Sequence, residues 1–163
     1  WGDISRVAAL YAAPHPCLIQ DHQEGLFSHP DLVRHRYFSI FPSLMLRAEP
    51  PGGCISVLEC GGNRLVGLAA LLPEEGPPRA HVGRLDFLIR PNHFARGKEL
   101  LQAVLDGAAE GGIAHVLAYF ASCDRDKIDL AEQVGLRPCA TLPDHFQLGT
   151  ERFDLTIYRG RLG

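Results

Sequence analysis

The feature that most constrains the fold is a pair of short apolar runs separated by three turn-forming residues. Residues 54–60 (CISVLEC) and 64–72 (RLVGLAALL) flank the tripeptide Gly61-Gly62-Asn63. Glycine and asparagine tolerate the positive φ angles that a tight hairpin turn requires. The pattern therefore predicts two antiparallel strands joined by a tight turn, and with them a sheet on which the rest of the chain must pack.

Extended and helical periods alternate after this hairpin. Further strands are predicted at 81–89, 114–120, 137–141 and 152–158, and helices at 97–111 and 124–134. Before the hairpin, helices are predicted at 4–11 and at 32–46, the latter capped by Asp31 and interrupted by Pro42. A proline-rich loop is expected at 73–78. Because strands and helices alternate only in the middle, we expect an α/β (α+β) fold with a mixed sheet.

Length, charge and cysteine usage exclude several classes of protein. The 163 residues suit a single domain, 1–163, and the net charge of −3 gives no general attraction to nucleic acid. No apolar run approaches the ~20 residues of a membrane span. The five cysteines lack CxxC spacing, and the eight histidines lack HxH or HExxH spacing. We therefore expect no metal site, no membrane partner and a cytoplasmic protein with reduced thiols.

Three motifs in the second half of the chain resemble, in order and spacing, those of the GNAT N-acetyltransferases. Residues 79–91 (RAHVGRLDFLIRP) are similar to the central strand of that family, which ends in a V-x-P-like element. Residues 133–137 (QVGLR) resemble the turn after the last helix, and 142–154 the closing hairpin of amino-acid N-acyltransferases. The resemblance covers about residues 50–162. It implies a GNAT acyl-CoA N-acyltransferase fold, with a mixed twisted central sheet flanked by about four helices and no counterpart of the first strand.

The resemblance also implies where acetyl-CoA or another acyl-CoA binds. In that fold the central strand and the next strand splay apart, so the pantetheine arm pairs with exposed backbone, and the pyrophosphate sits at the start of the following helix. The matching residues are Phe87, Leu88 and Ile89 for the strand edge, and Ala95, Arg96, Gly97 and Lys98 for the phosphate turn. Gly97 would allow close backbone approach. However, the Gly-x-Gly segment is about two residues short, and Glu99 would repel a phosphate.

The positions used for acid–base chemistry in the family are changed here. Arg84 stands where related enzymes often place a catalytic Glu, and Asp86, two residues on and on the same strand face, is the candidate base. The usual Asn at the start of the last helix is matched by Asp124, and the usual Tyr by Ala131, which transfers no proton. Tyr119 is the nearest phenol in sequence. The candidate catalytic residues are thus Asp86, Tyr119 and Asp124, with structural roles as the alternative for Asp86 and Tyr119.

Several functions remain open at this level. Residue Cys123 precedes a predicted helix and could form a nucleophile pair with His93 or His115, or be an unreactive thiol. The leading hypothesis is an acyl-CoA-dependent N-acyltransferase, moving an acetyl group to the amine of a small molecule. One alternative is a degenerate GNAT-like domain that binds a partner or ligand without catalysis, within a larger protein. Another acts on the pantetheine of an acyl carrier protein. The acceptor is left open, as is the choice between monomer and homodimer.

Overall fold

The hairpin predicted from the sequence is present. The computed structural model describes residues 4–11, 53–74 and 79–163. Strand β1 (Cys54–Cys60) pairs antiparallel with β2 (Arg64–Pro73). The connecting turn uses positive φ at Gly62 (77°) and Asn63 (61°), as the sequence predicted. The predicted helix at 32–46 with its Asp31 cap, and residues 75–78 of the predicted loop, lie outside the described residues.

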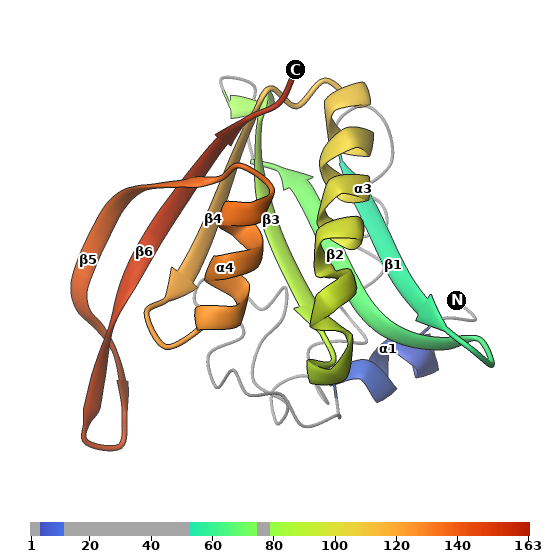
Figure 1. Ribbon diagram of the computed structural model, residues 1–163. Coiled ribbons are helices and arrows are strands. Elements are labelled where there is room, and N and C mark those ends of the chain that lie inside the picture. The colour runs from blue at the N-terminus through green and yellow to red at the C-terminus, as the bar shows by residue number, and fades with distance from the viewer. Residues whose placement is uncertain (1–3, 12–52, 75–78) are drawn as a thin grey trace.

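All six described strands form one mixed sheet. Its remaining strands are β3 (Val82–Ile89), β4 (His115–Ala121), β5 (Arg137–Leu148) and β6 (Glu151–Arg161). The order across the sheet is β1-β2-β3-β4-β6-β5, and β3 and β4 are the parallel pair among antiparallel neighbours. The prediction of a mixed sheet is confirmed. Strands β5 and β6 run further than predicted and form a long hairpin that projects at the lower left of Figure 1.

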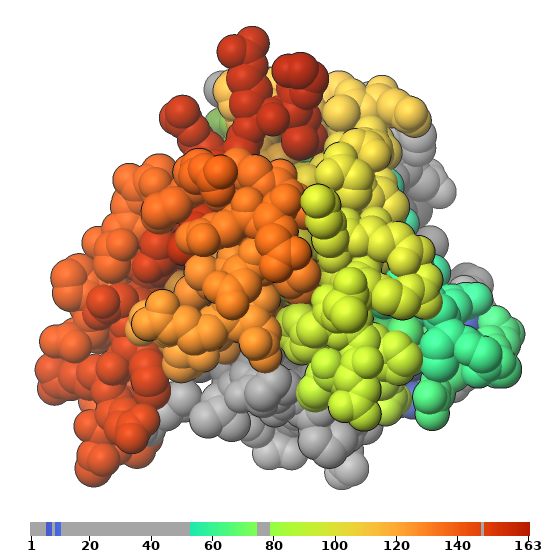
Figure 2. Space-filling view, in the orientation of Figure 1, coloured from blue at the N-terminus to red at the C-terminus, as the bar shows by residue number. Residues whose placement is uncertain are grey.

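Helices α3 and α4 lie on the same face of this sheet (Figures 1 and 2). The structure describes α1 (Ile4–Tyr11), the 3-10 helix η2 (Pro91–Arg96), α3 (Gly97–Glu110) and α4 (Arg125–Gln133). The apolar stripe of α3, from Leu100 to Ala108, is buried. Within the described ranges no strand precedes β1. None of the described helices has the length and apolar character needed to cross a membrane.

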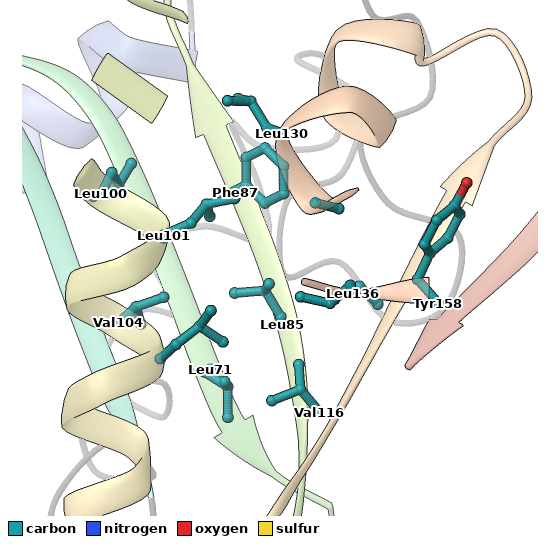
Figure 3. Packing of buried hydrophobic residues seen from close by; sticks show 14 of the residues in the cluster. Leu71, Leu85, Phe87, Leu100, Leu101, Val104, Val116, Leu130, Leu136 and Tyr158 are labelled. Atoms are coloured by element: carbon teal, nitrogen blue, oxygen red, sulfur yellow. The ribbon is translucent and has the colours of Figure 1, made fainter. Parts of the chain in front are cut away.

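The core lies between the sheet and the two helices (Figure 3). The apolar positions of the predicted strands and helices give eleven expected core residues, and ten of them are buried: Leu65, Leu68, Leu85, Phe87, Ile89, Leu101, Val104, Leu105, Val116 and Leu136. The eleventh, Ile157, is half-buried. Ring contacts link three neighbouring strands, because Phe87 meets Phe120 edge-on at 5.9 Å and Phe120 meets Tyr158 at 5.4 Å between ring centroids. Strands β3, β4 and β6 are thereby packed into one core beneath α4.

Candidate functional site

Strands β3 and β4 stop pairing halfway along their length. Their pairing ends at Leu85 and Ala118, although β3 continues to Ile89 and β4 to Ala121. The N–H of Arg90 donates to the carbonyl of Val66 on the β2 side (2.8 Å). Since backbone groups alternate in direction along a strand, the even positions of β3 face β2 and the odd positions face β4. Beyond Leu85, β3 therefore has an edge that β4 does not cover.

Two of the three residues predicted for the strand edge present their backbone to this gap. By the alternation, Phe87 and Ile89 direct their N–H and C=O groups toward β4. Leu88 directs its backbone toward β2, where it pairs with Leu68. The prediction that the backbone of Leu88 lies on the exposed edge is therefore wrong. The side chains of all three are buried.

A partly buried charge pair lies at the edge of β3 that β4 does not cover. The N–H of Phe87 donates to Oδ1 of Asp86 (2.8 Å), so this carboxylate takes the place that a carbonyl of β4 would otherwise have. Nζ of Lys127, from α4, lies 3.8 Å from the same oxygen. It also lies 5.5 Å from the centroid of the Phe87 ring. The side chain of Lys127 is only 5% exposed and that of Asp86 is 18% exposed, so little water screens this pair.

The predicted phosphate turn is organised differently from the expectation. Helix η2 leads directly into α3, and the N–H of Gly97 donates to the carbonyl of Phe94. The guanidinium of Arg96 donates to both carboxylate oxygens of Glu99 (2.9 and 2.8 Å) and to the carbonyl of Glu59 (2.9 Å). The hydrogen bond with Arg96 lowers the pKa of Glu99. Much of the positive charge expected from Arg96 is thus neutralised by Glu99.

Residue Gly97 is buried in a helix contact. A Cβ at this position would lie 2.4 Å from Cδ1 of Leu130 on α4 and 3.0 Å from Cδ1 of Ile89 on β3. Its φ of −60° is available to any residue, so glycine is needed for space and not for its backbone conformation. Gly97 allows close approach of α4, and its approach to an anion stays a prediction. Of the predicted turn, Ala95 and Lys98 are exposed.

The other two candidate catalytic residues lie near the open ends of the strands. Tyr119 directly follows Ala118, the last residue of β4 that pairs with β3, as Asp86 directly follows Leu85. Burial, followed by the charge of Glu74, raises the pKa of Tyr119, so its phenol is protonated at neutral pH. Asp124 immediately precedes α4 and is 5% exposed; its backbone carbonyl accepts the N–H of Ile128 (3.0 Å).

Several solved structures of similar shape are acetyltransferases. No family model and no curated protein matches the chain in sequence. A GNAT-family acetyltransferase from Streptococcus pneumoniae superposes with a TM-score of 0.78 at 14% identity, over 99% of this chain and 95% of that one. A ribosomal-protein-alanine N-acetyltransferase from Brucella melitensis superposes with a TM-score of 0.72 at 20% identity, over 99% of this chain and 95% of that one. The phosphinothricin acetyltransferase of Sinorhizobium meliloti, solved with acetyl-CoA, has a TM-score of 0.73 at 12% identity, over 99% of this chain and 84% of that one. The chain has the GNAT fold.

The structure bears on two further positions in this GNAT fold, Ala131 and Cys123. Residue Ala131, matched to the usual tyrosine, is fully buried in the core. His115 begins β4 and Cys123 follows the end of it, so the two lie roughly 20 Å apart at ~3.3 Å per residue and cannot form a nucleophile pair. Partial burial, and next the charge of Asp124, raises the pKa of Cys123, which keeps the thiol protonated.

The structure also places near Asp86 one residue, Lys127, that the sequence analysis did not identify. Lys127 is buried on the face of α4 that also carries Ile128, Leu130 and Ala131. A signal was present, because 127 shares the i, i+3, i+4 spacing of that apolar stripe. Charged residues are rarely buried unless paired, so a lysine in the stripe indicates an internal partner.

In the described part of the chain, no three potential metal ligands come together.

Proposed function

We propose that this protein is an acyl-CoA-dependent N-acyltransferase that moves an acyl group, with acetyl expected, to the amine of a small molecule in the cytoplasm. The observation that carries the proposal is the edge of β3 that β4 does not cover, where Phe87 and Ile89 direct backbone groups toward the place of an extended ligand. The GNAT fold supports it, since the similar Sinorhizobium meliloti enzyme was solved with acetyl-CoA. The residues present fit the pantetheine arm better than they fit the phosphates.

Each candidate residue has a role that its surroundings permit. The carboxylate of Asp86, at the uncovered edge, would take a proton from the attacking amine as its nitrogen bonds to the acyl carbon. The C–S bond then breaks, and Tyr119, whose raised pKa keeps its proton in place, would donate that proton to the departing thiolate. Asp124 immediately precedes α4, the helix that packs beside the site. Lys98, exposed in the first turn of α3, is the available cation for a phosphate.

Isothermal calorimetry and a CoA-release assay test this proposal. We expect acetyl-CoA to bind and CoA to be released in the presence of amino acids or other small amines. Tyr119→Phe should lower kcat about 10²–10⁴-fold with little change in acetyl-CoA affinity, because it removes only the proton donor. Tyr158→Phe is the matched control, since the hydroxyl of Tyr158 donates to Glu132 on α4. Absence of heat and of thermal stabilisation at millimolar acetyl-CoA would refute the proposal.

A second candidate is a binding domain without catalysis. It is favoured by the neutralisation of Arg96 by Glu99 and by the N–H of Gly97, which already donates to the carbonyl of Phe94. Both features weaken the site that a pyrophosphate would need. Acyl transfer that Asp86→Asn abolishes would exclude this alternative, whereas tight binding without CoA release from any tested amine would favour it.

A further inference from the structure

One oxygen atom in this molecule accepts a backbone N–H and lies near an ammonium, at the point where β3 is no longer paired with β4. Oδ1 of Asp86 accepts the N–H of Phe87 at 2.8 Å and lies 3.8 Å from Nζ of Lys127. The N–H belongs to an edge that faces the gap, and the ammonium reaches that edge from α4. Together they attract a negatively charged oxygen from two directions.

The burial of Lys127 makes this arrangement more than a surface ion pair. Its side chain is 5% exposed and its ammonium lies over the ring of Phe87, at 5.5 Å from the centroid. Removing an ammonium from water is costly unless an anion or several acceptors replace the water. The fold places this cation where β4 no longer covers the backbone edge of β3. A lysine used only to pack α4 could instead extend into solvent, as long lysine side chains commonly do.

The two donors match the requirements of an acyl carbonyl. When an amine attacks a thioester, negative charge develops on the carbonyl oxygen, and preformed donors in a site with little water stabilise that charge. An N–H in the middle of an uncovered strand provides one such donor, and a buried ammonium provides a second that carries full charge. The carboxylate oxygen of Asp86 lies where such a carbonyl oxygen would bind.

We infer that Phe87 N–H and the Lys127 ammonium form the binding site for the carbonyl oxygen of the acyl thioester, and that Asp86 holds this site until the acyl group displaces its carboxylate. The inference rests on the proposed acyltransferase function and adds a catalytic residue, Lys127, to it. The displaced carboxylate stays on β3, beside the acyl carbon. It is then free to accept the proton that the amine loses as the C–N bond forms and the C–S bond breaks.

Competition between acyl group and carboxylate can be measured by comparing acetyl-CoA with CoA, which lacks the carbonyl. Calorimetry gives the ratio of the two dissociation constants for each variant. In Asp86→Ala the preference for acetyl-CoA should rise about tenfold over the wild type, since the carbonyl no longer competes for a charged donor. Adding Lys127→Met should remove that gain. The exposed residues Asp129 and Arg125 of the same helix provide controls, Asp129→Ala and Arg125→Met, that should leave the ratio unchanged.

A conservative variant guards against loss of folding. Asp86→Ala leaves the buried ammonium of Lys127 without this carboxylate and could unfold the domain. Asp86→Asn keeps the size and the hydrogen-bond acceptor but removes the charge, so it should raise the preference in the same direction by a smaller factor. Melting curves test whether each variant is folded.

The outcomes separate the inference from the function on which it rests. Binding of both ligands with the same ratio in the wild type and in the folded Asp86 and Lys127 variants would overturn the inference and leave acyl-CoA binding intact. Failure of every folded variant to bind either ligand would overturn the proposed function and the inference together. A ratio that rises in Asp86→Ala but is unaffected by Lys127→Met would also contradict the inference, because the ammonium would then have no part in the site.

Discussion

Replacing Gly97 by alanine should destabilise the fold, although alanine normally favours helices. The added Cβ would lie 2.4 Å from Cδ1 and 2.9 Å from Cδ2 of Leu130, and 3.0 Å from Cδ1 of Ile89. Carbon atoms pack at about 3.5–4.0 Å, so Leu130 would have to move by about 1 Å. Leu130 is 5% exposed and Ile89 is 1% exposed, so neither has solvent to move into. Overpacking of this kind costs about 1–3 kcal/mol.

The opposing gain is smaller than this cost. Gly97 has φ −60° and ψ −38°, which alanine adopts without strain, so the substitution restricts the unfolded chain and stabilises by about 0.4–1 kcal/mol. We therefore expect a net loss of about 1–2 kcal/mol. With an m-value near 2 kcal/mol/M, the midpoint of urea unfolding should fall by about 0.5–1 M. Gly61→Ala is the matched control, because no atom lies within 4 Å of a Cβ placed there.

A double-mutant cycle identifies the contact responsible. Leu130→Ala removes the two nearest of the three atoms that the new Cβ would meet, so Gly97→Ala should cost much less in that background, with a coupling energy of about 1–2 kcal/mol. If Gly97→Ala is as stable as the wild type, or more stable, then α4 does not pack against the start of α3 in the way described. The role of Gly97 as a helix contact would then be wrong, and its predicted role beside a phosphate would regain support.

Three further predictions concern the core. Leu105→Ala should lower the free energy of unfolding by about 2–5 kcal/mol, as measured in urea, because Leu105 is 4% exposed in the main cluster. Burial and the charge of Glu132 raise the pKa of Tyr158 in the folded state. The protonated phenol therefore stabilises the fold fully at pH values below the unfolded pKa of about 10, and this stabilisation is lost as the pH rises through the folded pKa. Tyr158→Phe should therefore flatten the fall in melting temperature above about pH 10. Ala131→Tyr should lower the melting temperature and should not raise the rate of CoA release, because residue 131 is 0% exposed and has no room for a phenol; a folded, faster enzyme would contradict this.

The sequence could predict the elements whose signals are local. The hairpin at β1 and β2 follows from two apolar runs and a turn with glycine and asparagine, and α3 follows from one stripe of apolar residues. The sequence predicts β5 too short because Pro143 and Asp144 interrupt the pattern after residue 141. The structure tolerates them because β5 is an edge strand, where a missing N–H can face solvent. A register shift between Leu142 and Phe146 accommodates Asp144 at φ 51°.

The candidate site was less predictable because it depends on distant residues. The edge arises where β3 and β4 stop pairing, after Leu85 and Ala118. These two strands are separated in sequence by η2 and α3. No local pattern marks that point. The partnership of Asp86 with Lys127 joins a strand and a helix far apart in sequence. Gly97 shows the opposite difficulty, since a glycine at a helix start fits both an anion site and a close helix contact, and only packing against Leu130 decides between them.

The short parallel pairing between β3 and β4 divides the sheet into two antiparallel units. One unit contains β1, β2 and β3, and the other contains β4, β6 and β5. Four residue pairs, from Val82 with His115 to Leu85 with Ala118, join them along the backbone. In native-state hydrogen exchange, each unit is expected to open as a cooperative block, with the amides of the junction limited by the less stable one. A ligand that bridges the gap would contact both blocks, so it should slow exchange throughout the sheet and not only at the residues it touches.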